Sequence, residues 1–177
     1  MKYPFAIRFL HWTMALIIAE QLLMGAIMVR LDDATPLKFD QLYPLHKSVG
    51  LLIVALFVLR LSIRATHVLP ALPEQLAGWE KRSAKLTHAA LYVLMIVVPV
   101  FGYSMSSTFT QSDGVTFFGV PVPELLPKND GQFAVFQWLH RVSAYLLLAL
   151  MVMHIAAVIK HRFFERDRAN DVLPRML

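Results

Sequence analysis

The sequence has no cysteine. This absence excludes disulfide bonds, iron–sulfur clusters with thiolate ligands, and the C-x-x-C-H attachment of c-type haem. A haem or soft metal could therefore be held only non-covalently. The seven histidines are the main candidates for its ligands.

Charged residues are also scarce. They make up 16% of the chain, whereas 57% of its residues are hydrophobic. A soluble domain would carry about 25% charged residues. We therefore predict an integral membrane protein that forms one domain over residues 1–177, with little room for a separate soluble domain.

Long apolar runs divide the chain. A membrane helix needs about 20 apolar residues to cross a hydrocarbon core of roughly 30 Å. Runs of this kind lie at about residues 9–29, 45–61, 86–105 and 139–159. The prediction is an all-α, multi-pass bundle of four transmembrane helices.

The basic residues are distributed unevenly between the two sides of this bundle. Five of the 17 Lys and Arg residues fall on the side away from the termini, namely Arg30, Lys38, Lys47, Lys128 and Arg141. The other twelve fall on the side of the termini, which predicts that both termini are cytoplasmic. This bias explains most of the basic pI of 9.7, so nucleic acid is not implied. The basic C-terminal tail could also contact anionic lipid.

Two histidines in the last span are the starting point for function. His140 and His154 are fourteen positions apart. At 3.6 residues per turn they leave the same helix face, separated by about 21 Å along the axis. Ionisable side chains inside a membrane helix are costly and usually face the bundle interior. The spacing therefore predicts one ligand site near each membrane surface.

The alternating direction of the helices assigns the remaining histidines to these two levels. At the outer level only His46 and His140 meet, so this pairing is required if an outer metal site exists. At the inner level His11, His88 and His154 compete, and spacing leaves the choice open. We expect the other two histidines, His67 and His161, to be solvated.

Paired imidazoles from facing helices are the ligands that a low-spin b haem requires, and such a haem passes electrons without binding substrate at the iron. The alternative is that the histidines form hydrogen bonds between helices. Five histidines at two matched levels favour haem, given the cost of placing each in lipid.

Four other residues fit a haem site, each with an ordinary alternative. Gly50 lies one turn after His46 and leaves room for a macrocycle or for helix packing. Arg60 could pair with a haem propionate or extend to the cytoplasmic surface. Lys47 and Arg141 follow candidate ligands directly, and either attract an anion or contact lipid headgroups.

These motifs together resemble the bacterial cytochrome b561 family, relatives of the haem-b subunits of formate dehydrogenase and hydrogenase. The matching features, in chain order, are HW at His11–Trp12, H-x-x-x-G at His46–Gly50, Arg60 with Arg64, H-x-x-x-Y and P-x-x-G from His88 to Gly102, His140 with His154, and the tail HRFFERD…VLPRM. The resemblance covers essentially the whole chain. It implies two b haems in the bacterial inner membrane.

The resemblance also implies a ligand set. It assigns His11 and His154 to the inner haem and His46 and His140 to the outer haem. His88 then becomes a candidate for a supporting role or for a quinone site.

Family members that this chain resembles act as superoxide:quinone oxidoreductases, so we expect superoxide oxidation at the outer face and reduction of ubiquinone. Lys47 and Arg141 are the candidate residues for attracting superoxide. The alternative is an electron-transfer subunit or carrier that links a partner dehydrogenase or a soluble cytochrome to the quinone pool.

Overall fold

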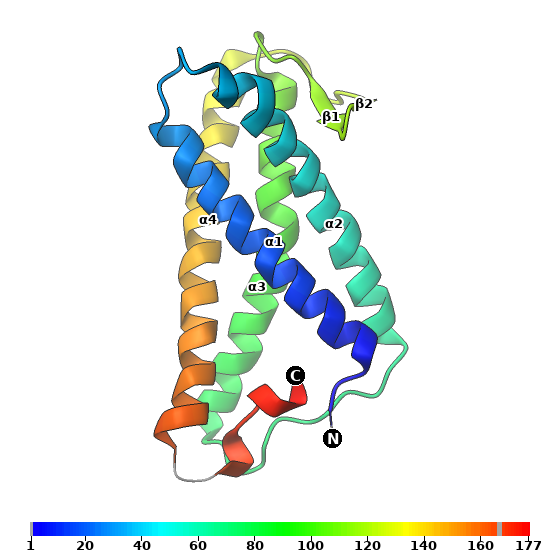
Figure 1. The fold of residues 1–177 in the computed structure, drawn as a ribbon, viewed down its shortest axis with the longest axis vertical. Helices are drawn as coiled ribbons and strands as arrows, with labels where there is room; N and C mark the ends of the chain where they lie inside the picture. Colours follow the sequence, from blue (N-terminus) through cyan, green and yellow to red (C-terminus); the bar gives the residue numbers. More distant parts are fainter. Residues whose placement is uncertain (1, 166–167) are drawn as a thin grey trace.

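The computed structural model describes residues 2–165 and 168–177, and within them four long helices form a bundle (Figure 1). They are α1 (Phe5–Arg30), α2 (Tyr43–Ala65), α3 (Gly78–Thr108) and α4 (Asp130–Ile159). All four are long and apolar enough to cross a membrane. The prediction of a four-helix membrane bundle is confirmed.

Both termini lie at the same end of the bundle (Figure 1). We call it the termini end, and the opposite end the hairpin end. The assignment of the termini end to the cytoplasm stays a prediction, which rests on the distribution of the basic residues. One of these, Arg166, lies outside the described residues.

Several helices extend beyond their apolar runs. Helix α3 begins at Gly78 rather than near residue 86, and α4 begins at Asp130 rather than near residue 139. Polar caps start these extensions: the side chain of Asn129 accepts a hydrogen bond from the Gln132 amide at 3.0 Å, and Glu80 accepts one from the Ala77 amide at 3.1 Å. Hydrophobicity marks the membrane part of a helix, whereas capping marks its true end.

Short elements join and extend the helices. The π-helical turns η1 (Lys38–Leu42) and η2 (Lys160–Phe164) lead into α2 and continue α4, and the 3₁₀ turns η3 (Arg168–Asn170) and η4 (Leu173–Arg175) lie in the tail. Between α3 and α4, strands β1 (Val115–Phe117) and β2 (Val120–Val122) form an antiparallel hairpin. The sequence analysis did not predict this hairpin.

An apolar cluster fills the middle of the bundle. All four helices contribute buried side chains to it: Met14, Ile18, Ile53, Phe57, Leu94, Met95 and Leu147. On each helix these residues lie between the positions of the two histidine levels. The core therefore separates two polar sites, one toward each end of the bundle.

Candidate functional site

At the hairpin end, α2 and α4 bring His46 and His140 together. Their ring centroids are 6.2 Å apart, and the rings are nearly perpendicular at 86°. The Nδ1 atom of His140 lies 2.9 Å from the Val98 carbonyl oxygen. Nδ1 is therefore the protonated nitrogen that donates to this carbonyl, which leaves Nε2 of His140 free to act as a ligand.

Two glycines make room for these rings. A Cβ atom added to Gly102 would lie 3.1 Å from both Cε1 and Nδ1 of His140, and one added to Gly25 would lie 3.6 Å from Cε1 of His46. The sequence analysis assigned Gly102 only to the P-x-x-G motif and did not single out Gly25. The contact between Gly102 and His140 depends on the register of α3 against α4, which no local pattern encodes.

At the termini end, three histidines meet. His154 on α4 faces His11 on α1 at 6.3 Å between ring centroids, with the planes at 80°. It also faces His88 on α3 at 5.3 Å and 63°. The structure thus places all three competitors for the inner level side by side.

Distances between ring centres distinguish the two possible pairs. Two metal–nitrogen bonds of about 2 Å, plus about 1.2 Å from each nitrogen to its ring centre, put the centroids of opposed imidazoles about 6.4 Å apart. The pairs His46–His140 and His11–His154 match this value. The His88–His154 pair is about 1 Å too close for a metal to lie between opposed rings.

Buried polar atoms also fit a group held at each level. His46 Nδ1 and Arg60 Nε are buried and have no hydrogen-bond partner among the described residues. Leaving such atoms unpaired is costly. The guanidinium groups of Arg60 and Arg64 both lie 5.9 Å from the ring centre of Tyr92. Arg60 is also near enough to act electrostatically on His11 and His154. This arrangement suits the acidic groups of a cofactor.

Gly50 borders open space on α2, because an added Cβ atom would meet no protein atom within 4 Å. This finding agrees with room for a flat macrocycle one turn after His46. It does not support tight helix packing at this glycine.

The predicted anion-attracting residues differ in their surroundings. The ammonium group of Lys47 donates to the Gly114 carbonyl at 2.8 Å, so the residue secures the hairpin to α2. Arg141 is exposed on α4 beside His140. Of the two, Arg141 is the better placed to meet a solute.

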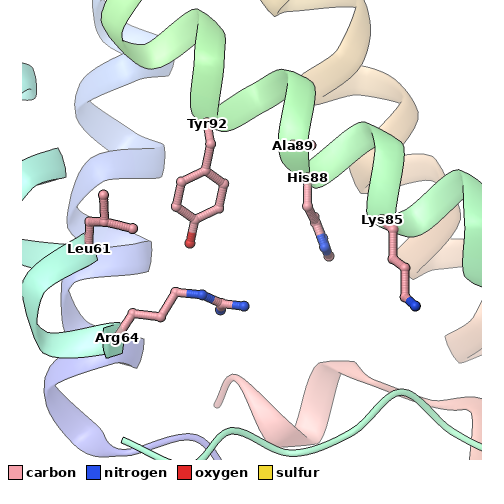
Figure 2. A pocket seen from close by; sticks show the side chains of 6 residues that line it. All are labelled: Leu61, Arg64, Lys85, His88, Ala89 and Tyr92. Atoms are coloured by element: carbon pink, nitrogen blue, oxygen red, sulfur yellow. The ribbon is translucent and has the colours of Figure 1, made fainter. Parts of the chain in front are cut away.

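A pocket opens between α2 and α3 at the termini end (Figure 2). It has a volume of about 330 Å³ and is lined by Leu61, Arg64, Lys85, His88, Ala89 and Tyr92. The side chains of Arg64, Lys85, His88 and Tyr92 point into one opening (Figure 2). Two cations and a phenol thus meet at this pocket beside the imidazole of His88, one of the three inner histidines.

The C-terminal tail closes the bundle near these residues. Trp12 Nε1 donates to the Met176 carbonyl at 2.9 Å, and the Tyr3 amide donates to the Arg175 carbonyl at 3.0 Å. The ring of Trp12 also lies 5.5 Å from that of His11. The tail is therefore connected to an inner histidine through one side chain.

His67 and His161 lie outside both sites. His67 is exposed, and its Nδ1 lies 2.8 Å from the Ile63 carbonyl. His161 donates to Glu165 at 2.8 Å, and this bond lowers the pKa of the Glu165 carboxyl below its ordinary value. Lys160 pairs with both Glu165 and Glu80. Lys160 thus lies between the two carboxylates of the Glu80–His161–Glu165 cluster, whose ligand atoms are close enough together to hold a metal.

Comparison with known proteins decides the family. The family model described as "Prokaryotic cytochrome b561" matches residues 2–177. The chain belongs to this family. It is 30% identical over 174 residues to cytochrome b561 homolog 2 of Escherichia coli K12, covering 94% of this chain and 86% of the relative. It is 24% identical over 132 residues to cytochrome b561 homolog 1 of the same organism, covering 75% and 72%.

Membership of the cytochrome b561 family makes the chain a membrane electron-transfer protein and implies haem b. The residues present fit that group: paired imidazoles at a suitable separation, a glycine beside open space, and an arginine whose buried Nε has no partner among the described residues.

Proposed function

We propose that this chain moves electrons across the bacterial inner membrane between two b haems, from superoxide at the hairpin end to ubiquinone at the termini end. The observation that carries the proposal is the pair of matching centroid distances, 6.2 Å for His46–His140 and 6.3 Å for His11–His154. These four histidines would hold the haems, and each haem would supply a one-electron carrier when bound.

The chain's own residues hold and orient these groups. His140 is fixed by its bond to the Val98 carbonyl, Gly102 and Gly25 leave space for the rings of His140 and His46, and Gly50 borders open space. Arg60, which is half-buried with an unpaired Nε, would offer its cation to a propionate near the inner pair. The two levels are about 21 Å apart along α4, so electrons would cross most of the hydrocarbon core between them.

Reduction of ubiquinone takes two electrons and two protons, and we assign it to the pocket at His88. The Tyr92 hydroxyl and the His88 ring both face this opening (Figure 2) and can hold protons beside a quinone oxygen. Arg64 and Lys85 attract the negative charge that develops on that oxygen. The apolar side chains of Leu61 and Ala89 in the lining also suit the ring of a lipid-soluble quinone.

At the hairpin end two superoxide anions would each lose one electron and leave as oxygen. Arg141 supplies an exposed positive charge next to a ligand of the outer pair. A local cation of this kind raises the capture rate of a small anion.

The other cations at this end favour a second candidate function, that of an electron-transfer subunit or carrier. Lys47 binds Gly114, Lys38 pairs with Asp33 at 2.5 Å, and Lys128 pairs with Glu124 at 2.6 Å. The pairing of Lys38 and Lys128 with carboxylates weakens the electrostatic steering of an anion toward this end. A chain without strong steering would also suit an electron-transfer subunit or carrier that accepts electrons from a partner dehydrogenase or a soluble cytochrome.

Haem counting tests the ligand assignment. We expect two haems per chain in the wild type. His46→Ala and His140→Ala should each lose one haem, and His11→Ala and His154→Ala should each lose the other, as seen in redox-resolved absorption spectra. Loss of a haem in His88→Ala with two retained in His11→Ala would overturn the inner assignment.

Quinone kinetics test the role of His88. Because the ring lines the pocket without being needed as a ligand, His88→Ala should keep both haem spectra. It should slow oxidation of the reduced protein by a soluble ubiquinone analogue by about a hundredfold or more, typical of a lost proton donor. Lys81→Ala on the same helix, outside the pocket, is the control. Unchanged quinone kinetics would assign His88 to packing.

A further inference from the structure

The carbonyl group that holds the His140 ring differs chemically from most others in α3. The Val98 carbonyl oxygen lies 2.9 Å from Nδ1 of His140 and accepts its hydrogen bond. Because residue 99 is proline, this carbonyl belongs to a tertiary amide. The additional alkyl group on the amide nitrogen donates electron density to the oxygen. A tertiary amide is therefore a stronger hydrogen-bond acceptor than an ordinary secondary amide.

Pro99 is unfavourable for the helix that contains it. It lies inside α3 and has no N–H group, so the Met95 carbonyl loses the donor that a helix supplies four residues later. Met95 belongs to the buried apolar cluster, and the hydrocarbon region offers no water in place of a missing donor. A residue that weakens a membrane helix in this way needs a compensating role, and its bond to Val98 provides one.

The two ends of the P-x-x-G motif act on the same histidine ring. Gly102 leaves the space into which His140 packs, since an added Cβ atom would lie 3.1 Å from two atoms of that ring. In a regular helix the amide of residue 102 also donates to the Val98 carbonyl, which has two lone pairs and can serve two donors. Pro99 thus strengthens the shared acceptor, and Gly102 lets the ring approach it.

The other histidine of this pair has no comparable bond. Nδ1 of His46 is buried and has no hydrogen-bond partner among the residues that the structure describes. A hydrogen bond donated by one ring nitrogen makes an imidazole a stronger electron donor at the other. Within the described chain, this effect at the hairpin end therefore comes through His140 alone.

We propose that the Val98–Pro99 amide lowers the reduction potential of the haem held at the His46–His140 pair, with Pro99 as a positioning residue that acts through His140. A more electron-rich imidazole stabilises ferric iron over ferrous iron. This inference rests on the haem that the proposed function assigns to the pair, and it is independent of superoxide and quinone.

Two replacements of residue 99 separate the strength of the acceptor from the shape of the helix. Pro99→Ala gives a secondary amide, which is a weaker acceptor, and restores the N–H donor to Met95. Lactic acid, the hydroxy-acid counterpart of alanine, gives an ester when it is introduced at position 99 by nonsense suppression. The ester is a still weaker acceptor and restores no donor. Val100→Ala is the control, because Val100 is 47% exposed on the same helix.

Redox titration of the complete protein in vesicles, followed by absorption spectra, measures the potential of each haem. We expect the potential at the hairpin end to rise in the order wild type, Pro99→Ala, lactic acid variant. It should stay unchanged in Val100→Ala, and the potential at the termini end should stay unchanged throughout. In Pro99→Ala the ferrous-to-ferric ratio at a fixed potential should rise about threefold, which corresponds to about 30 mV at 59 mV per tenfold for one electron.

A role of Pro99 in helix shape alone predicts a different order. Restoring the N–H donor would then give Pro99→Ala the larger shift and the ester the smaller one. That order, or unchanged potentials in both variants, would overturn the proposal. If one variant loses the hairpin-end haem, the other decides against the wild type. Loss in both would assign Pro99 to assembly of the site and also overturn it.

Failure of the proposed function has a separate signature. The wild-type chain would then lack the haem that His140→Ala is expected to remove, whereas failure of this inference leaves that haem in place with a potential that does not depend on residue 99.

Discussion

Gly102 shows how strongly one residue can constrain a ligand from a neighbouring helix. A methyl group at this position would lie 3.1 Å from two atoms of the His140 ring, closer than nearly all real contacts of this kind, so the ring would have to move away from the Val98 carbonyl. We expect Gly102→Ala to lower haem content from two per chain toward one, with loss of the hairpin-end haem. Haem extraction and redox titration would measure this. Two haems with unchanged potentials would contradict it.

Gly50 gives a complementary prediction, because its Cβ would meet no protein atom within 4 Å. Gly50→Ala should therefore leave the folding of the haem-free chain unchanged. It should disturb only a haem macrocycle that lies over this face of α2. We expect it to shift or weaken the hairpin-end haem while leaving the thermal stability of the haem-free protein unchanged. A variant with wild-type haem content and potentials would remove Gly50 from the site.

These two glycines mark the limit of prediction from sequence at the scale of single residues. The spacing of His140 and His154 follows from helix geometry alone, so their shared face could be predicted. The spacing could not choose between His11 and His88 as the partner of His154. That choice depends on a difference of about 1 Å between ring separations, which the packing of three helices sets.

At the scale of elements, the membrane helices were predictable and the connections were not. Four apolar runs gave the spans because length and hydrophobicity are local properties of the chain. The two strands of the hairpin pair only three residues each. Hydrogen bonds with Lys47 and Ser48, which are far from the hairpin in sequence, hold it against α2. A strand pair this short has too few local signals to be recognised without that support.

The C-terminal tail is an element whose anchorage can be tested. Trp12→Phe keeps an aromatic ring beside His11 and removes only the donor to the Met176 carbonyl. One such hydrogen bond contributes about 1 kcal/mol, so amide hydrogen exchange in residues 173–177 should become about fivefold faster. Trp138→Phe is the matched control, because Trp138 is exposed on α4 far along the chain from the tail. Equal exchange in both variants would show that Trp12 does not hold the tail.

At the scale of the whole molecule, the arrangement of charge agrees with a transmembrane electron path more than with a surface for protein docking in the cytoplasm. Arg60, Arg64 and Lys85 gather near the inner histidines and the pocket lined by His88. The hairpin end carries few basic residues, and most of these are tied to backbone or carboxylate groups. Capture of superoxide at this end would then depend on the local cations Lys47 and Arg141, of which Arg141 is exposed beside His140.

Charge reversal at Arg141 tests that conclusion. If superoxide donates electrons at the hairpin end, Arg141→Glu should slow reduction of the haems by superoxide about tenfold at 0.01 M salt, where the Debye length is roughly 30 Å. The loss should shrink at 0.15 M salt, where charges beyond about 8 Å are screened. Arg141→Lys keeps the positive charge, so superoxide should reduce the haems of this variant at nearly the wild-type rate. Lys38 is unsuitable as a control because it is buried in a pair with Asp33.

The potential of the outer haem must be measured in each Arg141 variant, because removing a nearby cation would also lower it. A slower rate that follows the potential and not the salt concentration would assign Arg141 to tuning the haem, since steering alone depends on ionic strength. Reduction by superoxide no faster in the wild type than in His46→Ala would exclude superoxide as the donor. The engaged lysines at this end would then favour a redox protein as the source of electrons.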